Sequence, residues 1–267
     1  MIDKTQVLDH NRAAWNQQSR GASRWCEAVD GDVIAAAQQG QWEVILTPTK
    51  MVPRSWFGAL LNKDVLCLAS GGGQQAPVLA AAGARVVSFD NSDEQLAKDL
   101  AVARQHNLNL VIEQGDMADL SRFADASFDL VFQPVANVFI PDVVPVWREC
   151  YRLLRPGGVL LAGFMNPAFY LFDHEAPTPR EVLQVRFAQP YSDLLSRESV
   201  DLDKKARAGE ALEFGHSLEH QLGGQIDAGF VLSGFYEDHW DNAATPLNQY
   251  MPTSMATRAS KPLPASA

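Results

Sequence analysis

The chain has 267 residues, of which 46% are hydrophobic and 20% charged, a composition typical of a globular protein with one large domain or one domain and an appendage. Its net charge of −10 and its lack of a dense run of Lys and Arg argue against a nucleic acid as substrate or partner, because polyanions are bound by clustered cations. No apolar run approaches the roughly 18 residues of a membrane helix, no signal peptide opens the chain, and no Cys pair is spaced for a disulfide or a zinc site. We therefore expect a cytoplasmic protein that binds no metal and no membrane.

Residues 1–62 are rich in tryptophan and open with a predicted amphipathic helix. Helical spacing places Val7, Asn11 and Trp15 along one face of this helix. The polar Asn11 interrupts an otherwise apolar stripe, and Trp25 lies in the loop that follows.

Residues 63–165 alternate short apolar runs with amphipathic stretches, the pattern of parallel strands joined by crossover helices. Capping residues mark the boundaries, since Gly83 ends one predicted helix and Ser92 begins the next. The predicted strands are residues 65–68, 84–90, 109–113, 127–132 and 159–164. This region therefore predicts an α/β fold with a mostly parallel sheet.

The last part of the chain is less regular. Residues 166–214 are polar and are expected to form an insert, and residues 230–235 are predicted to be a strand. Residues 259–267 are small and rich in proline and are expected to be a disordered tail. Before the strand, a predicted helix has a stripe of Leu218, Leu222 and Ile226.

The first predicted strand runs into three glycines in the segment VLCLASGGGQQA, residues 65–76. In an open α/β fold this strand-to-helix turn lies at the carboxyl edge of the sheet, where ligands bind. Glycines have no Cβ atoms, so backbone amides there can face a ligand directly. Asp90 ends the neighbouring strand, 17 residues after Gly73, where its carboxylate can accept hydrogen bonds from both hydroxyls of a ribose. The glycines and the acid together indicate a nucleoside cofactor.

Two classes of cofactor compete for this turn. The pattern Gly71-x-Gly73-x-x-Ala76 satisfies the dinucleotide fingerprint and favours NAD(P). Asp116 and Met117 follow the third predicted strand and favour an adenosyl group of another kind, because the carboxylate can accept from the adenine amino group while the thioether packs on the ring. The Tyr-x-x-x-Lys pair of a hydride-transferring enzyme does not occur in the sequence.

The chain resembles the class I S-adenosylmethionine (SAM)-dependent methyltransferases, in their small-molecule branch. The resemblance covers residues 63–165 well and residues 216–230 more loosely. It implies a doubly wound sheet of seven mostly parallel strands with the last strand antiparallel, a methyltransferase domain over residues 63–258, and SAM as cofactor. The segments that carry it are DVLCLASGGG (64–73), VVSFDNS (86–92), GDMADL (115–120), SFDLVF (127–132) and YRLLRPGGVLL (151–161).

The resemblance also implies which residues contact SAM. Ser70, Gly71 and Gly73 would contact its methionine and ribose part, and Asp90 would bind its ribose hydroxyls. Its adenine would lie beside Asn91, Asp116 and Met117. Gln133 would lie near its sulfonium.

The first motif departs from the family pattern, which has an acid where Cys67 stands and a glycine where Ala69 stands. That acid normally helps to hold the methionine amino group, so Gln74, Asn11 or Gln133 must supply the contact or SAM binds weakly. Alternatively, Gln74 is an exposed residue of the first helical turn. Cys67 is expected to be a buried and inert thiol.

Residues 1–62 are expected to form a helical lid over the SAM cleft. In this arrangement Asn11 either points into the cleft or lies at the edge of its helix. Trp25 either lies over the sulfonium by cation–π attraction or fills the core.

His216, just before the last predicted helix, is the candidate general base, with a capping or exposed position as the alternative. Methyl transfer from a sulfonium depends on a positioned nucleophile and the exclusion of water, so no catalytic side chain need be evident. Aromatic residues of the insert either build a wall for a planar or partly apolar acceptor or pack beneath the loop. They are Phe169, Tyr170, Phe172, Phe187 and Tyr191.

The loop after the fourth predicted strand, QPVANVFIPD, lacks the N/D-P-P-Y/F run of amino-methylating nucleic-acid enzymes and the Pro-Cys pair of cytosine-C5 enzymes. Together with the acidic charge, this predicts methyl transfer from SAM to a small molecule through an O, N, S or C atom, by a monomer or homodimer. The alternatives are an NAD(P)-dependent oxidoreductase and a non-catalytic SAM-binding regulator.

Overall fold

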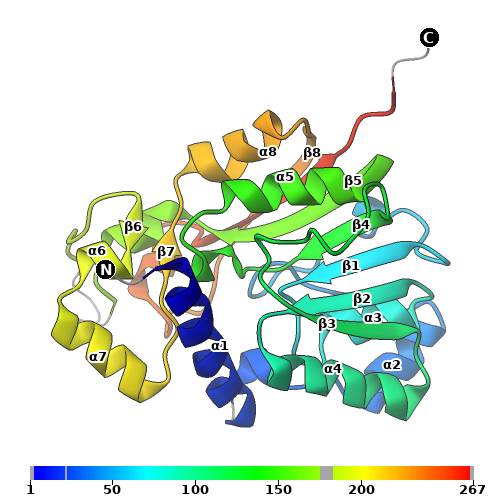
Figure 1. Cartoon of the computed structure of the whole chain (residues 1–267), viewed down its shortest axis with the longest axis horizontal. Helices are drawn as coiled ribbons and strands as arrows, with labels where there is room; N and C mark the ends of the chain where they lie inside the picture. Colours follow the sequence, from blue (N-terminus) through cyan, green and yellow to red (C-terminus); the bar gives the residue numbers. More distant parts are fainter. Residues whose placement is uncertain (1–2, 22, 175–182, 265–267) are drawn as a thin grey trace.

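The computed structural model describes residues 3–21, 23–174 and 183–264, with a seven-stranded sheet at its centre (Figure 1). The strand order is β3-β2-β1-β4-β5-β9-β8, and neighbours pair in parallel except at β9, which runs antiparallel to β5 and β8. This confirms the predicted mostly parallel sheet with its last strand antiparallel. The strands are β1 Asp64–Leu68, β2 Arg85–Asp90, β3 Leu110–Gln114, β4 Phe128–Gln133, β5 Leu154–Met165, β8 Val231–Asp238 and β9 Ser254–Ser260.

Helices cover both faces of the sheet, because successive side chains of a buried strand point to opposite sides. Val65 and Cys67 belong to a core with residues of α2, α3 and α4, whereas Leu66 and Leu68 belong to a core with residues of α5. Short α8 packs beside α5. The helices are α2 Gly31–Gln38, α3 Gln75–Ala81, α4 Asp93–His106, α5 Val144–Leu153 and α8 Gly224–Asp227.

Helix α1 (Lys4–Arg20) lies between α4 and the segment that follows β5 (Figure 1). Asp3 begins α1 with a capping box, since it accepts from the Gln6 amide while the Gln6 side chain accepts from the Asp3 amide, both at 2.9 Å. The segment after β5 contains a two-stranded sheet and two short helices. Their bounds are β6 Tyr191–Ser192, α6 Asp193–Ser196, α7 Ser199–Ala208 and β7 Phe214–Gly215.

The predicted helical stripe near the end of the chain is wrong. Leu218 and Ile226 are 46% and 55% exposed, and the buried side chains are Gln221 and Gln225. The buried face is polar because hydrogen bonds satisfy both glutamines: Gln221 accepts from the Asn137 side-chain amide at 2.9 Å and Gln225 accepts from the Thr257 hydroxyl at 3.0 Å. A π-helical turn covers Glu219–Gly223.

The predicted disordered tail, residues 259–267, begins inside strand β9. Ala259 pairs with Leu160 of β5, and the Lys261 ammonium donates to the carbonyls of Tyr151 and Leu154, both at 2.8 Å. The boundary is therefore wrong for the first residues of the tail, while residues 265–267 lie outside the described part of the chain. Strand β9 was missed because its sequence, SMATRAS, is small and largely polar, although Ala256 and Ala259 are buried in the cores on the two faces of the sheet.

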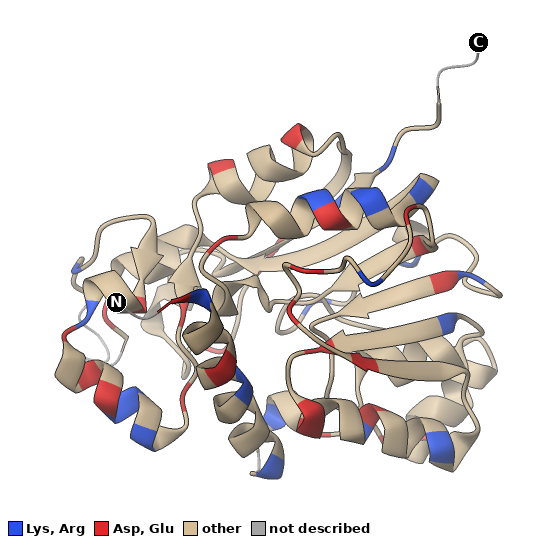
Figure 2. Cartoon of the chain, viewed as in Figure 1, with Lys and Arg blue, Asp and Glu red and all other residues tan. Residues whose placement is uncertain are grey.

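None of the helices in the described residues is long and apolar enough to cross a membrane. Lys and Arg are interspersed with Asp and Glu along the outer helices (Figure 2). Within the described ranges, no group of three or more His, Cys, Asp or Glu is arranged to hold a metal ion.

Candidate active site

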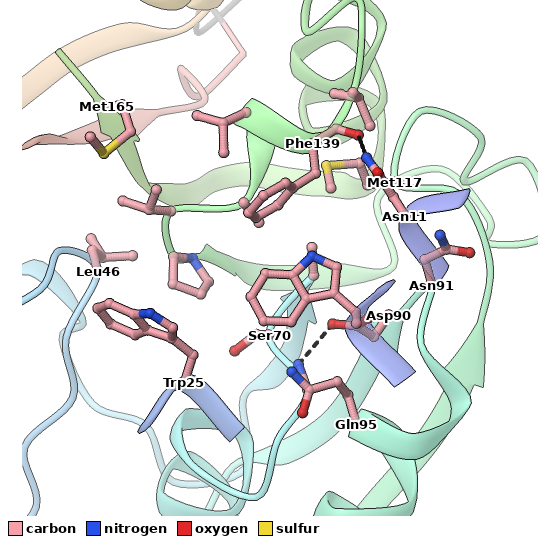
Figure 3. A pocket seen from close by; sticks show the side chains of 18 of the residues that line it. Asn11, Trp25, Leu46, Ser70, Asp90, Asn91, Gln95, Met117, Phe139 and Met165 are labelled. Carbon is pink, nitrogen blue, oxygen red and sulfur yellow. Dashed lines mark hydrogen bonds between the residues drawn. The ribbon is translucent and has the colours of Figure 1, made fainter. Parts of the chain in front are cut away.

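A cavity of about 360 Å³ lies at the carboxyl ends of β1, β2 and β4, beside α1 (Figure 3). This volume lies within the range of small-molecule sites, and the lining is mostly apolar with polar groups at the strand ends. Most of the residues predicted to bind SAM come together here. Those in the lining are Asn11, Trp25, Ser70, Gly71, Gln74, Asp90, Asn91, Asp116 and Met117.

The turn after β1 has a backbone that favours glycine. Gly73 has φ of +78° and Ala69, at the position of a family glycine, has φ of +47°. A Cβ on Gly71 would lie 2.7 Å from Cβ of Gln95 and 3.2 Å from Oδ2 of Asp90. The turn therefore packs directly against α4 and the end of β2, with no room for a side chain at Gly71.

The Asp90 carboxylate is held by the backbone on both sides. Its Oδ2 accepts from the Gly71 amide at 3.0 Å and its Oδ1 from the Ser92 amide at 2.9 Å. Burial raises the pKa of Asp90 above its ordinary value, and the backbone hydrogen bonds oppose that shift by stabilising the charged form. Each oxygen retains a second lone pair, so the carboxylate can accept two further hydroxyl hydrogens.

The residues predicted for the adenine also lie together. Met117 is buried and Asp116 is fixed by accepting from the Ala118 amide at 2.9 Å. Asn91 donates its side-chain amide to the Leu8 carbonyl at 2.8 Å and so connects β2 to α1.

Gly73 and Gln133 are not among the residues that line the cavity. Gln133 is fully buried at the end of β4, and its amide nitrogen lies 3.5 Å from Sδ of Met117. The Gly73 amide donates to Asp99 Oδ1 on α4 at 2.6 Å. The structure therefore places both residues behind the cavity wall.

The predicted base His216 is also outside the lining. It is 4% exposed, and its Nε2 lies 2.9 Å from the Asn137 carbonyl. Burial lowers its pKa, which favours the neutral ring. The geometry does not support the prediction that His216 acts as the general base.

Asn11 and Gln74 line the cavity, but their side-chain amides hold neighbouring segments. Asn11 donates to the carbonyls of Phe139 at 2.7 Å and Leu212 at 3.1 Å, and accepts from the Leu212 amide at 2.7 Å (Figure 3). Gln74 donates to the carbonyls of Arg24 and Glu27, at 3.0 and 2.8 Å. Asn11 is thus buried in the stripe of α1 by backbone hydrogen bonds that sequence alone does not show.

Several aromatic side chains line the cavity. The ring centroids of Trp25 and Trp240 are 5.2 Å apart, and Trp15 contacts Phe139 edge-on at 5.1 Å. Trp240 lies far along the chain from Trp25 and has no motif around it, so the sequence gives no sign of its place in the lining. Other lining residues missed in the same way are Ile45, Leu46, Thr47, Pro48, Gln95 and Glu213.

The insert supplies part of the wall that was predicted for it. Phe169 and Tyr170 line the cavity, whereas Tyr191 stacks behind Tyr170 with centroids 5.1 Å apart. Phe172 and Phe187 are not in the lining.

Comparison with known proteins gives matches over the same region and over the whole chain. A methyltransferase domain family matches residues 66–162. Over 255 residues the chain is 47% identical to the uncharacterized methyltransferase YbaJ of Bacillus subtilis, a match that spans 96% of this chain and 98% of YbaJ. A SAM-dependent methyltransferase from Mesorhizobium loti superposes with a TM-score of 0.60 at 19% identity, over 78% of this chain and 94% of that one. One from Methanosarcina mazei superposes with a TM-score of 0.55 at 18% identity, over 80% of this chain and 100% of that one.

The chain therefore belongs to the class I SAM-dependent methyltransferases. It is an enzyme with SAM as its cofactor. This membership excludes NAD(P), the other cofactor that the glycine pattern allowed, and the alternative of a non-catalytic SAM-binding regulator. The cavity itself fits SAM, because a glycine-rich turn meets a carboxylate able to bind a ribose. In addition, the buried Ser70 Oγ in the lining has no hydrogen-bond partner among the described residues.

Proposed function

We propose that this methyltransferase acts on a small, mostly apolar molecule without negative charge. SAM would occupy the end of the cavity beside Asp90 and Met117, and the acceptor the end beside Leu46 and Met165, which lie on opposite sides of the pocket (Figure 3). The observation that carries the proposal is the lining, which includes no Lys, Arg or His among the described residues.

The charge of the lining supports this class of acceptor. Its ionisable side chains, as far as the chain is described, include the carboxylic acids Asp90, Asp116 and Glu213. The lining offers a carboxylate or phosphate on the acceptor no cationic side chain and places carboxylates near it, so such a group is disfavoured even beside the positively charged sulfur of SAM. A neutral or cationic acceptor with an apolar body meets no such penalty.

The chain contributes positioning and exclusion of water to the reaction. SAM supplies a methyl group on a positively charged sulfur. The aromatic ring of Trp15 is suited to stabilise a cation in the cavity, whereas the rings of Trp25 and Trp240 already hold the Arg24 guanidinium, 4.7 and 5.7 Å from their centroids. The apolar walls keep water out and limit the acceptor to few orientations, and holding reactants about 3 Å apart accounts for a large part of such rate enhancements.

Glu213 is the carboxylate that we assign to the acceptor. The Tyr170 hydroxyl donates to its Oε2 at 2.8 Å and so orients it at the end of the cavity formed by the insert. In this position Glu213 can accept a hydrogen bond from the acceptor and, for an acceptor that loses a proton on methylation, receive that proton.

A direct test uses a metabolite extract separated by ion exchange into cationic, neutral and anionic pools. Each pool is incubated with SAM and enzyme, and products heavier by one CH₂ are sought by mass spectrometry, with the Asp90→Ala enzyme as the control for background. We expect products from the cationic or neutral pools. Products from the anionic pool alone would contradict the proposed acceptor class.

We also infer a reducing compartment such as the cytoplasm. Cys26, Cys67 and Cys150 are all free and buried, and burial raises the pKa of each thiol. Apolar surroundings of this kind keep a thiol protonated and inert.

A further inference from the structure

Asp99 is a buried carboxylic acid on α4 that no sequence motif singled out. It is fully buried, and its Oδ1 accepts from the Gly73 amide at 2.6 Å while its Oδ2 accepts from the Ser88 hydroxyl at 2.5 Å. Hydrogen bonds to a charged group are the stronger kind, and here one of them ends on the last glycine of the turn. Asp99 does not line the cavity, so any influence on SAM passes through the turn.

The groups that face Asp99 come from two neighbouring strands. Ser88 and Asp90 lie on β2, Cys67 lies on β1, and α3 carries no titratable side chain. The adjacent Lys98 directs its ammonium to the Cys26 carbonyl. Burial raises the pKa of Asp99 to about 7, with the nearby Asp90 adding to the shift and the bonds from Ser88 and Gly73 opposing it.

The position of Asp99 coincides with the gap in the first motif. Cys67 stands where the family pattern has an acid, and Cys67 pairs in register with Ser88, the residue that donates to Asp99. A carboxylate is therefore present behind the glycine turn, but it comes from α4 and not from β1.

We propose that Asp99 is a positioning residue for SAM: its carboxylate holds the Gly73 amide, and through it the Gly71–Gly73 turn, in the conformation that accepts the cofactor. Without this acceptor the Gly73 amide would be buried and unpaired, and the turn would relax away from the position that SAM requires. The inference rests on the turn being part of the SAM site, which Asp90→Ala tests separately. Failure of the SAM-site assignment can thus be distinguished from failure of the positioning role of Asp99.

The test is isothermal titration calorimetry with SAM on Asp99→Ala, Asp99→Asn and Ser88→Ala. Asp99→Ala should raise the Kd for SAM about tenfold, as expected for loss of a hydrogen bond to a charged group. Asp99→Asn keeps an oxygen for the Gly73 amide and should restore the Kd to within about threefold of wild type. Ser88→Ala is the matched control, since it removes the other bond of the same carboxylate. It should lower the melting temperature and, at about pH 8.5, where deprotonation of Asp99 is favoured, leave the Kd for SAM within about twofold of wild type.

A purely structural role predicts a different result. Asp99→Ala would then lower the fraction of protein that binds SAM, seen as a lower stoichiometry, while the remaining sites bind with the wild-type Kd. That outcome would overturn the proposal.

If Asp99→Ala does not fold, the proposal is tested by the pH dependence of the Kd for SAM in the wild type and in Asp99→Asn. The wild-type Kd for SAM should fall as the pH rises from about 6 to about 8.5, because the deprotonated carboxylate binds the Gly73 amide more strongly. Asp99→Asn has no such titration, so its profile should be flatter than that of the wild type. Parallel profiles for the two proteins would refute the role of Asp99.

Discussion

Asp90 is the residue on which binding of the SAM ribose depends in the proposed site. Asp90→Ala removes a carboxylate that the backbone holds in place and that can accept two hydroxyl hydrogens. We expect SAM binding to weaken by about 2 kcal/mol, roughly thirtyfold in Kd, measured by calorimetry. Asp119→Ala, which removes an exposed carboxylate that does not line the cavity, is the control and should bind SAM normally. An Asp90→Ala affinity within about twofold of wild type would contradict the ribose assignment.

Gly71 tests the close packing of the turn. In Gly71→Ala the new Cβ would meet the Cβ of Gln95 at 2.7 Å, so either the turn or α4 must shift. We expect a lower melting temperature and loss of most SAM affinity. The matched control is Gly223→Ala, where the nearest atom to a new Cβ is Cγ of Glu219 at 3.8 Å, an ordinary contact. Equal effects of the two substitutions on the Kd for SAM would argue against a special role for the turn.

Asp99 should make the stability of the protein depend on pH. Its pKa is raised from 3.8 to about 7 in the folded chain, so the folded state binds a proton more tightly than the unfolded state between these values. The corresponding contribution to stability is fully present below about pH 4 and is lost as the pH rises through about 7. Urea unfolding at about pH 5 and about pH 8 should therefore show the wild type losing stability relative to Asp99→Asn. The quantity to compare is the free energy of unfolding of the wild type minus that of Asp99→Asn. If it stays constant or increases as the pH rises, the Asp99 carboxyl does not titrate in this way.

Helix α1 is the element that we propose as the lid over SAM. Its Leu8, Asn11 and Trp15 line the cavity, and Asn11 alone makes three hydrogen bonds to Phe139 and Leu212. These bonds attach α1 to the loop after β4 and to the segment before β7. The lid therefore depends on contacts between elements that are distant in the sequence.

Asn11→Ala should release this lid. Loss of its amide leaves buried backbone groups unpaired, so we expect faster amide hydrogen exchange along α1 and a Kd for SAM about fivefold higher. Thr5→Ala, an exposed position on the same helix, should change neither measurement. Faster exchange of α1 with an unchanged Kd would show that α1 covers the cavity without contributing to cofactor binding.

At the scale of the whole molecule, the acceptor end of the cavity is assembled from distant parts of the chain. Leu46 precedes the sheet, Met165 ends β5, Glu213 closes the insert and Trp240 follows β8. No single segment of the sequence contains this part of the site. Its chemistry, apolar walls with one carboxylate oriented by a tyrosine, appears only when the chain is folded.

Glu213→Gln tests the function of that assembly. With an acceptor from the mass-spectrometric screen, we expect turnover to fall by about tenfold or more and the Kd for SAM to stay unchanged, because Glu213 is assigned to the acceptor and not to the cofactor. Glu210→Gln, an exposed carboxylate nearby in the sequence, is the control. A loss of SAM affinity in Glu213→Gln that matches the loss of turnover would place Glu213 at the cofactor.

The sequence by itself predicted six of the seven strands of the sheet, the class of enzyme and the residues at the strand ends that line one end of the cavity. Each of these is encoded locally: a buried parallel strand reads as a short apolar run, and the residue that follows it must lie at the carboxyl edge. For that reason Asp90, Asp116 and Met117 could be placed from strand ends alone.

The tertiary structure decided the rest. Strand β9 is buried by the cores on both faces of the sheet although its own residues are small and largely polar. The buried face of the segment around α8 consists of glutamines whose hydrogen-bond partners lie far away in the sequence. Asp99 contacts the glycine turn, and Glu213 and Trp240 line the cavity. Each comes from a part of the chain whose local sequence pattern has no relation to the site, so no motif indicates these contacts. Contacts between distant segments depend on how whole elements pack against one another, and that information is not present in any short stretch of sequence.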